Sequence, residues 1–166
     1  MLLSQGSRTE RRNRQQAGQS LVEMAFVFVL FFLLLIGVLE FGRAVWTYNT
    51  IIQSTREGAR WAVTNARATY NLGTYTVNGA DLTAVKNIVA YGSPGGTEPI
   101  VPGINPGMVN VSISAVDVDP AGTPINSKVS VSVSGYQFRF LVPIAPTITI
   151  PAYETSLYTE ALGRTS

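Results

Sequence analysis

The sequence predicts an α+β protein in which a long N-terminal helix is followed by a short helix and a three- or four-stranded antiparallel sheet. Three observations carry this prediction. An uncharged apolar run lies near the N-terminus, a helical spacing of apolar residues continues beyond it, and an alternation of period two begins after residue 108. Of the 166 residues, 46% are hydrophobic and 13% are charged, and this composition excludes a wholly disordered chain.

The apolar run extends from Met24 to Leu39 and is bounded by Glu23 and Glu40. As a helix it spans about 24 Å at 1.5 Å per residue. Extended back to residue 21, it approaches the hydrocarbon thickness of a bilayer. By length alone the run also fits a signal-peptide core, but the helical pattern continues through the weak small-residue cleavage site at its end. We expect a membrane-spanning segment at about residues 21–39.

Positive charge gathers before this run. Residues 1–18 contain four arginines and one glutamate, whereas the rest of the chain contains eight basic and nine acidic residues. Basic residues that flank a span remain in the cytoplasm, so we expect a cytoplasmic N-terminus and an external C-terminus. The net charge of +2 therefore arises in the tail, and the absence of basic excess elsewhere argues against nucleic-acid binding.

The helical pattern continues past the apolar run, and nothing forbids a single helix from about Gln19 to Ala68, since no proline precedes Pro94. Trp46 and Tyr48 suit a membrane interface and suit equally well packing on a globular part. The expected apolar face of the second half has spacings of three and four. Its members are Phe41, Val45, Tyr48, Ile52, Thr55, Ala59 and Val63.

A short helix is predicted at residues 79–92, with Asp81 as its N-cap and Gly92 as its end. Its apolar face consists of Leu82, Val85, Ile88 and Val89. Residues 92–107 contain five glycines and four prolines, which predicts an irregular surface loop.

The alternation from Val109 predicts a strand with one buried face. A second strand begins at Lys128, and the parity of its apolar residues reverses at Gly135, which predicts a bulge there. Residues 147–150 and 153–162 read as further strand, with Pro151 placing the element at an edge or dividing it.

Catalytic and metal chemistry has few candidate residues, because the chain contains no cysteine and no histidine. We expect no catalytic site, no metal and no cofactor. Asp117 and Asp119 suggest a calcium loop, but the glycine and acidic residue that such a loop needs at later positions are absent. Ordinary turn chemistry is favoured there.

The stretch "AGQSLVE", residues 17–23, resembles the processing site of type IV pilin-like proteins. In those proteins a prepilin peptidase cuts after a glycine, and a glutamate follows as the fifth mature residue. The resemblance implies cleavage after Gly18, a new N-terminus at Gln19, and Glu23 as that fifth residue.

A longer resemblance covers roughly residues 17–63. The stretch "SLVEMAFVFVLFFLLLIGVLEFGRA" followed by "NTIIQSTREGARWAV" is similar to the TadE-like pseudopilins of tight-adherence (Tad/Flp) pilus systems. Gln19 stands where many pilins have an aromatic residue, and Met24 stands where the small major pilin usually has tyrosine, which favours a pseudopilin. The matching family-motif residues on the helix are Glu40, Phe41, Gly42, Arg43, Arg56, Glu57, Gly58 and Arg60.

The resemblance implies a leader at residues 1–18, a pilin-like long helix at 19–68 and an extracytoplasmic α+β domain at 69–166. Assembly would pair the new amine of Gln19 with Glu23 of a neighbouring subunit and pack Phe26, Leu30 and Leu34 between helices. The implied partners are other pilin subunits, the prepilin peptidase, the inner-membrane assembly platform and the lipid bilayer. The protein would be a single-pass inner-membrane protein that becomes extracellular in a pilus.

Two other classes of protein compete with this interpretation. One is a membrane-anchored binding module whose globular part recognises a ligand through the loop at 92–107 and whose N-terminus is never cleaved. The other is a secreted enzyme, but no pair of carboxylates has convincing spacing. An intact N-terminus in the mature protein would favour the binding module.

Overall fold

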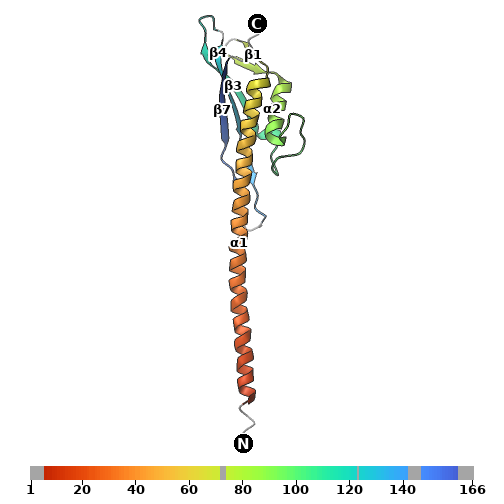
Figure 1. Ribbon diagram of the computed structural model, residues 1–166, viewed down its shortest axis with the longest axis vertical. Coiled ribbons are helices and arrows are strands. Elements are labelled where there is room, and N and C mark those ends of the chain that lie inside the picture. Colours follow the sequence, from red (N-terminus) through yellow and green to blue (C-terminus); the bar gives the residue numbers. More distant parts are fainter. Residues whose placement is uncertain (1–5, 72–73, 123, 142–146, 161–166) are drawn as a thin grey trace. The chain divides into compact units, whose positions relative to one another are not determined.

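The computed structural model describes residues 6–71, 74–122, 124–141 and 147–160, and within these ranges it describes the side chains from Gly18 to Tyr158. It has the predicted α+β arrangement, with a long helix, a short helix and antiparallel sheets (Figure 1). The chain divides into two compact units, Met1–Arg43 and Ala44–Ser166.

Helix α1 runs from Gly6 to Asn65. It begins before the predicted start at Gln19, because nothing from Gly6 onward breaks a helix. It ends before Ala68, which opens strand β1. The side chains of the leader arginines lie outside the described residues.

The first unit contains the apolar run. Within the described residues one helix segment, Gly18–Asn65, is long and apolar enough to cross a membrane. Its most apolar window has a mean hydropathy of 2.8, and no residue in that window is buried. Length and composition of this segment therefore fit a single-pass membrane anchor.

The second unit has one hydrophobic core, which joins α1, α2 and the strands. The predicted buried face of α1 is partly wrong. Thr55 and Ala59 are buried, but Phe41 and Val45 are exposed, at 69% and 42%. The buried residues of this half are instead mainly small, and the stripe that they form is displaced around the helix from the predicted one. Its members are Thr47, Ile51, Ser54, Thr55, Gly58, Ala59 and Ala62.

Helix α2 spans Gly79–Tyr91 and buries Val85, Ile88 and Val89, as its spacing predicts. The predicted N-cap is wrong: Asn78, not Asp81, caps the helix, and its side chain accepts a hydrogen bond from the backbone amide of Ala80. The predicted end is confirmed, since Gly92 adopts the left-handed conformation with φ of 76°.

The loop after α2 is irregular as predicted, but it is not only a surface loop. Val101 and Ile104 are buried in the core, at 0% and 3% exposure. The loop ends in a 3₁₀ turn, η1, at Pro106–Met108. The loop is held against the domain by these two apolar side chains and by hydrogen bonds such as that from the Tyr136 hydroxyl to the carbonyl of Pro102.

The main sheet has the order β3-β4-β7 with antiparallel neighbours. Its strands are β3 (Val109–Val118), β4 (Pro124–Val133) and β7 (Tyr153–Glu160). Two short hairpins accompany it. They are formed by β1 (Ala68–Asn71) with β2 (Thr74–Val77) and by β5 (Gln137–Phe138) with β6 (Ile148–Thr149).

The predicted bulge at Gly135 is a break between two elements. β4 ends at Val133, Gly135 has a φ of 76°, and the chain resumes as β5 in another sheet. The change of sheet explains the reversed parity, since Phe138 is buried from β5 and Tyr136 from the connection before it. Pro151 divides β6 from β7, which is one of the two outcomes expected for it.

Candidate functional site

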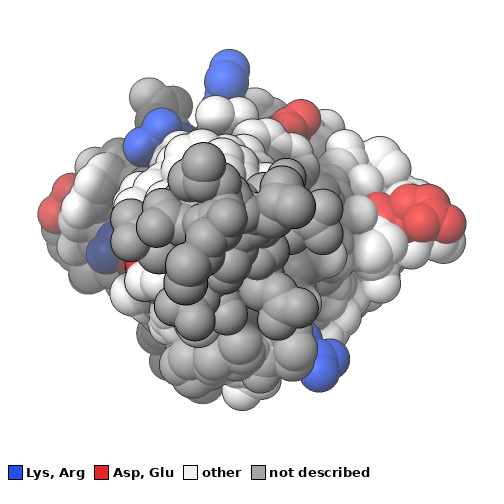
Figure 2. Space-filling model, turned by 90° about the horizontal axis from the view of Figure 1, so that it is seen from below, with Lys and Arg blue, Asp and Glu red and all other residues white. Residues whose placement is uncertain are grey.

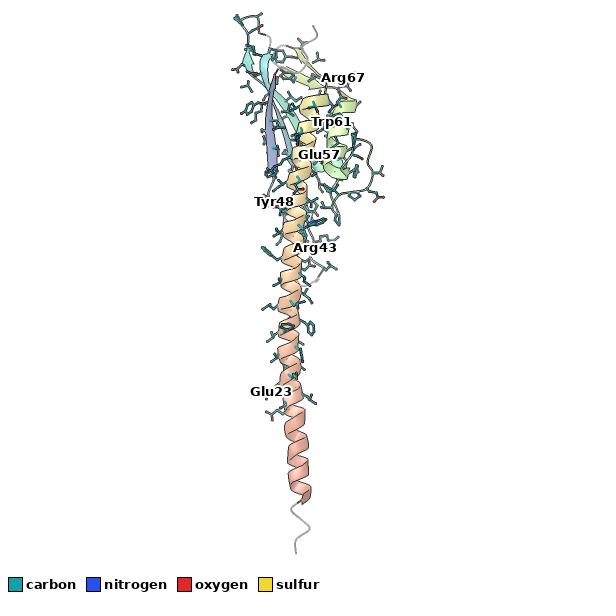
Figure 3. All side chains as sticks on the ribbon, in the orientation of Figure 1. Glu23, Arg43, Tyr48, Glu57, Trp61 and Arg67 are labelled. Carbon is teal, nitrogen blue, oxygen red and sulfur yellow. The ribbon has the colours of Figure 1, made fainter. Side chains whose placement is uncertain are left out.

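The predicted processing residues lie on consecutive turns of α1 in the first unit. Gln19 Nε2 donates a hydrogen bond of 3.2 Å to Glu23 Oε1, one turn further along (Figure 3). Both side chains are exposed, and nothing lies within 4 Å of a Cβ built on Gly18. The segment around the predicted cleavage position is therefore open to another protein.

The predicted assembly residues of the apolar run are also exposed. Phe26, Leu30 and Leu34 have exposed fractions of 69%, 67% and 68%. They stand three, seven and eleven positions after Glu23, so all four residues share one side of the helix. A continuous apolar surface of this kind requires lipid or another helix to cover it.

The first family motif lies at the end of the apolar run. Arg43 Nη2 donates a hydrogen bond of 2.7 Å to Glu40 Oε2, and this pair also forms a salt bridge. Glu40 is buried at 8% exposure, whereas Phe41 and Gly42 are exposed. Pairing with Arg43 reduces the cost of burying the Glu40 carboxylate.

The second motif, Arg56 to Arg60, contains a residue that is buried against α2 and residues that face solvent. Gly58 is buried, and a Cβ built on it would clash with Val89 Cγ2 of α2. A side chain at this position would therefore overlap α2. Arg56, Glu57 and Arg60 are exposed on the other side of the helix.

Arg56 also contacts the sheet. The hydrogen bond from its side chain lowers the pKa of Tyr153 at the start of β7, and a bond with Thr155 and the positive charge of Arg56 lower it further. The motif thus connects α1 to α2 through Gly58 and to β7 through Arg56.

The solvent-facing residues of the second motif line a polar hollow of the second unit. Gln53, Trp61 and Thr64 line it together with Arg56, Glu57 and Arg60. Gln53, Trp61 and Thr64 were not predicted from the sequence as site residues. Gln53 precedes Arg56 by three positions and Thr64 follows Arg60 by four. This helical spacing is a signal in the sequence that predicts a shared face.

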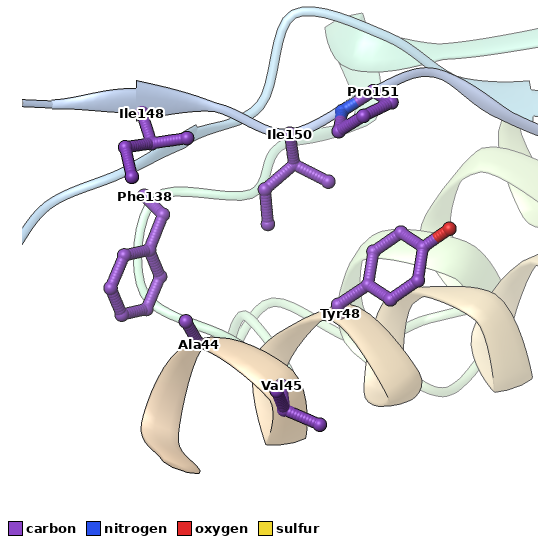
Figure 4. A pocket seen from close by; sticks show the side chains of 7 residues that line it. All are labelled: Ala44, Val45, Tyr48, Phe138, Ile148, Ile150 and Pro151. Atoms are coloured by element: carbon purple, nitrogen blue, oxygen red, sulfur yellow. The ribbon is translucent and has the colours of Figure 1, made fainter. Parts of the chain in front are cut away.

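A second, apolar pocket was not predicted from the sequence. It has a volume of about 340 Å³ and lies between α1 and the segment that contains β5 and β6 (Figure 4). Only the fold brings these residues together, because about 90 positions separate the two segments in the sequence. The lining residues are Ala44, Val45, Tyr48, Phe138, Ile148, Ile150 and Pro151.

The acidic residues of the β3–β4 connection take part in turn and strand bonding. Asp119 Oδ1 accepts a hydrogen bond from the amide of Ala121, and Asp117 Oδ2 accepts one from Asn126. In the described part of the chain no three acidic side chains are placed to hold a metal ion. Figure 2 shows both acidic and basic described side chains around the edge of the molecule in its view.

A family model described as "TadE-like protein" matches residues 18–60. No curated protein and no solved structure matches the chain. The matched segment begins at Gly18 and ends at Arg60, and so includes the predicted processing residues and both helix motifs. The predicted resemblance to the TadE-like family is confirmed over this segment.

Proposed function

We propose that this chain is a pseudopilin, a structural subunit that prepilin peptidase cleaves after Gly18 and that assembles into, or initiates, a Tad pilus for adhesion or secretion. The observation that carries the proposal is the position of the family match. It starts at Gly18 and continues along an apolar helix segment that the chain's own domain does not bury.

The proposed assembly step gives Glu23 a partner. A carboxylate at the centre of a bilayer costs about 2.5–3.5 kcal/mol on insertion scales, and less near the edge. Glu23 lies at the beginning of the apolar run and is exposed, where another subunit can reach it. Cleavage after Gly18 would create an amine at Gln19, and pairing of this amine with Glu23 of a neighbour would neutralise both charges between packed helices.

The remaining partners follow from the same steps. The basic leader would hold the N-terminus in the cytoplasm until the peptidase removes it. The inner-membrane assembly platform would then move the helix from the bilayer into the filament. Phe26, Leu30 and Leu34, which are exposed on the side of Glu23, would exchange lipid contacts for contacts with neighbouring helices.

The first experiment tests cleavage. We expect Gly18→Leu to prevent processing, because the peptidase requires a small residue before the scissile bond. Intact-mass analysis of protein from the native host should find the full chain. Gly37→Leu is the matched control, since nothing lies within 4 Å of a Cβ at either glycine. A chain that begins at Gln19 in Gly18→Leu would contradict the proposal, and an intact wild-type N-terminus would favour the anchored binding module.

The second experiment tests the role of Glu23 after cleavage. We expect Glu23→Ala to be processed normally and to be absent from sheared filaments, because the amine of its neighbour would have no counter-charge. Glu98→Ala removes an exposed carboxylate from the loop after α2, outside the family motifs, and should enter filaments normally. Normal incorporation of Glu23→Ala would eliminate the pairing step.

A further inference from the structure

The apolar pocket of the second unit has no charged side chain in its lining. Ala44, Val45 and Tyr48 form one wall from α1, and Phe138 of β5 and Ile148 of β6 form the other (Figure 4). The Tyr48 hydroxyl, the one polar side-chain group of the lining, points away from Ala44 and Val45. A pocket of this composition favours an apolar occupant over water.

The rim of this pocket exposes further apolar surface. Val45 and Ile148 are 42% and 50% exposed although both line the pocket. Trp46, between the pocket residues of α1, is 58% exposed. Tryptophan favours the headgroup region of a bilayer, where its amphipathic ring contacts both apolar and hydrated groups.

The pocket is close to the apolar run along the chain. Ala44 follows Leu39 by five positions, and five residues span at most about 18 Å even when fully extended. The headgroup region adds several ångströms to each side of the hydrocarbon core. If residues 21–39 cross the membrane, the α1 wall of the pocket is within reach of the interface.

We propose that the second unit contacts the bilayer through this pocket, with acyl-chain carbons of interfacial phospholipid between Val45 and Ile148 and with Trp46 at headgroup level. The inference rests on the proposed membrane anchoring of the preceding helix. Its specific content is that Ile148, more than 100 residues after the anchor, touches lipid. A partner protein would compete for the same surface.

The experiment uses the full chain in phosphatidylcholine vesicles without bromine, or with bromine on both shallow and deep acyl carbons, since bromine quenches only nearby tryptophan. Ile148→Trp in a Trp46→Phe/Trp61→Phe background places the reporter on the pocket. Two further single-tryptophan variants are the controls. Phe31→Trp in the same background is the positive control, because it reports contact of the anchor with lipid. Trp46→Phe is the negative control, because it retains only Trp61, which is half-buried against the core. We expect quenching at Ile148→Trp to approach that at Phe31→Trp.

The outcomes separate this inference from the proposed function. Quenching at Phe31→Trp alone would overturn the pocket contact and retain the anchor. Absence of quenching at both positions would overturn both. Equal quenching at Trp61 would show unspecific contact with lipid and would overturn the inference. An Ile148→Trp side chain that is shielded from solvent only in filaments would also overturn it, because another subunit would then occupy the pocket.

A second measurement avoids a new tryptophan. In Trp61→Phe, the native Trp46 is the reporter, and Ile148→Asp should reduce its quenching because a carboxylate at the rim disfavours lipid contact. Val118→Asp is the matched control, since Val118 is 51% exposed at the end of β3 and does not line the pocket. Unchanged Trp46 quenching in folded Ile148→Asp would overturn the proposal.

Discussion

The two halves of helix α1 use apolar residues in opposite ways. The first half, residues 21–41, exposes leucines, phenylalanines and valines, whereas the second half buries mainly glycine, alanine, serine and threonine. Ile51 is the one large aliphatic residue among the buried positions of the second half. The more apolar half is therefore the one that the chain's own domain leaves uncovered, and its surface suits lipid and neighbouring helices.

The small residues of the second half allow close approach of other elements. Val89 of α2 comes so near Gly58 that a single added methyl group would overlap it. Ser54 and Thr55 are buried, but both hydroxyls donate to the carbonyl of Ile51 and so remain paired. Burial in this helix therefore follows the size of the residues more closely than their hydropathy.

The largest expected effect tests whether the two halves of α1 have different surroundings. Leu30→Arg places a charge in the middle of the apolar run, which costs about 2.5–3.5 kcal/mol on insertion scales. Membrane fractionation with alkaline extraction should recover less of this variant in the bilayer. Gln53→Arg puts the same side chain on the exposed face of the second half and should insert normally. Equal insertion of both variants would contradict the assigned span.

The next effect tests whether the two halves of α1 differ in how closely other elements pack against them. We expect Gly58→Ala to destabilise the second unit by about 1–3 kcal/mol, because the new methyl group overlaps Val89. Chemical unfolding of the full chain in detergent, followed by Trp61 fluorescence, measures this change. Gly42→Ala is the matched control in the first half, where nothing lies within 4 Å of the new atom. A Gly58→Ala variant as stable as Gly42→Ala would show that close packing does not distinguish the halves.

Periodicity was enough to predict the classes of most elements. The apolar run, the spacing of α2 and the alternation in β3 each depend on a local pattern that the fold preserves. The predicted processing residues and the helix motifs were also proposed from local patterns, since Gly18 and Glu23 are five positions apart in the sequence. Features of this kind require no knowledge of what packs against them.

The errors share a different cause, because each depended on a contact with a distant residue. The face of α1 was misplaced because only α2 makes Gly58 a packing position, and a rule based on hydropathy favours Val45 instead. Asp81 was assigned as the cap of α2, but its carboxylate accepts a hydrogen bond from the amide of Arg67. The apolar pocket was missed because β5 and β6 reach α1 only through the fold.

A third, smaller effect is expected at Asn78, the N-cap of α2, because α2 covers Gly58 in the second half of α1. Asn78→Ala should destabilise α2 by about 1 kcal/mol, since the amide of Ala80 loses its acceptor. The same unfolding measurement applies. Asn78→Asp keeps an acceptor oxygen and is the control that should retain wild-type stability. If Asn78→Ala proved neutral, the side-chain cap would not support the element that covers Gly58.

The smallest effect concerns the contact of Arg56 with Tyr153, which has no counterpart in the exposed first half. The Arg56 hydrogen bond lowers the pKa of Tyr153 in the folded chain below the ordinary value of 10.0. Between the lowered pKa and 10.0 the unfolded chain therefore binds more protons than the folded one, and this contribution to stability rises with pH. It is complete above 10.0 and is lost as the pH falls through the folded-state value.

The measurement is the difference in unfolding free energy between the wild type and Tyr153→Phe at a series of alkaline pH values. We expect this difference to increase toward pH 10.0 in favour of the wild type. In an Arg56→Gln background the increase should become smaller, because the guanidinium is the largest cause of the lowered pKa and the bond with Thr155 remains. Parallel curves in both backgrounds would mean that Arg56 does not join the helix to β7. The second motif would then contribute to the fold through the packing of Gly58 alone.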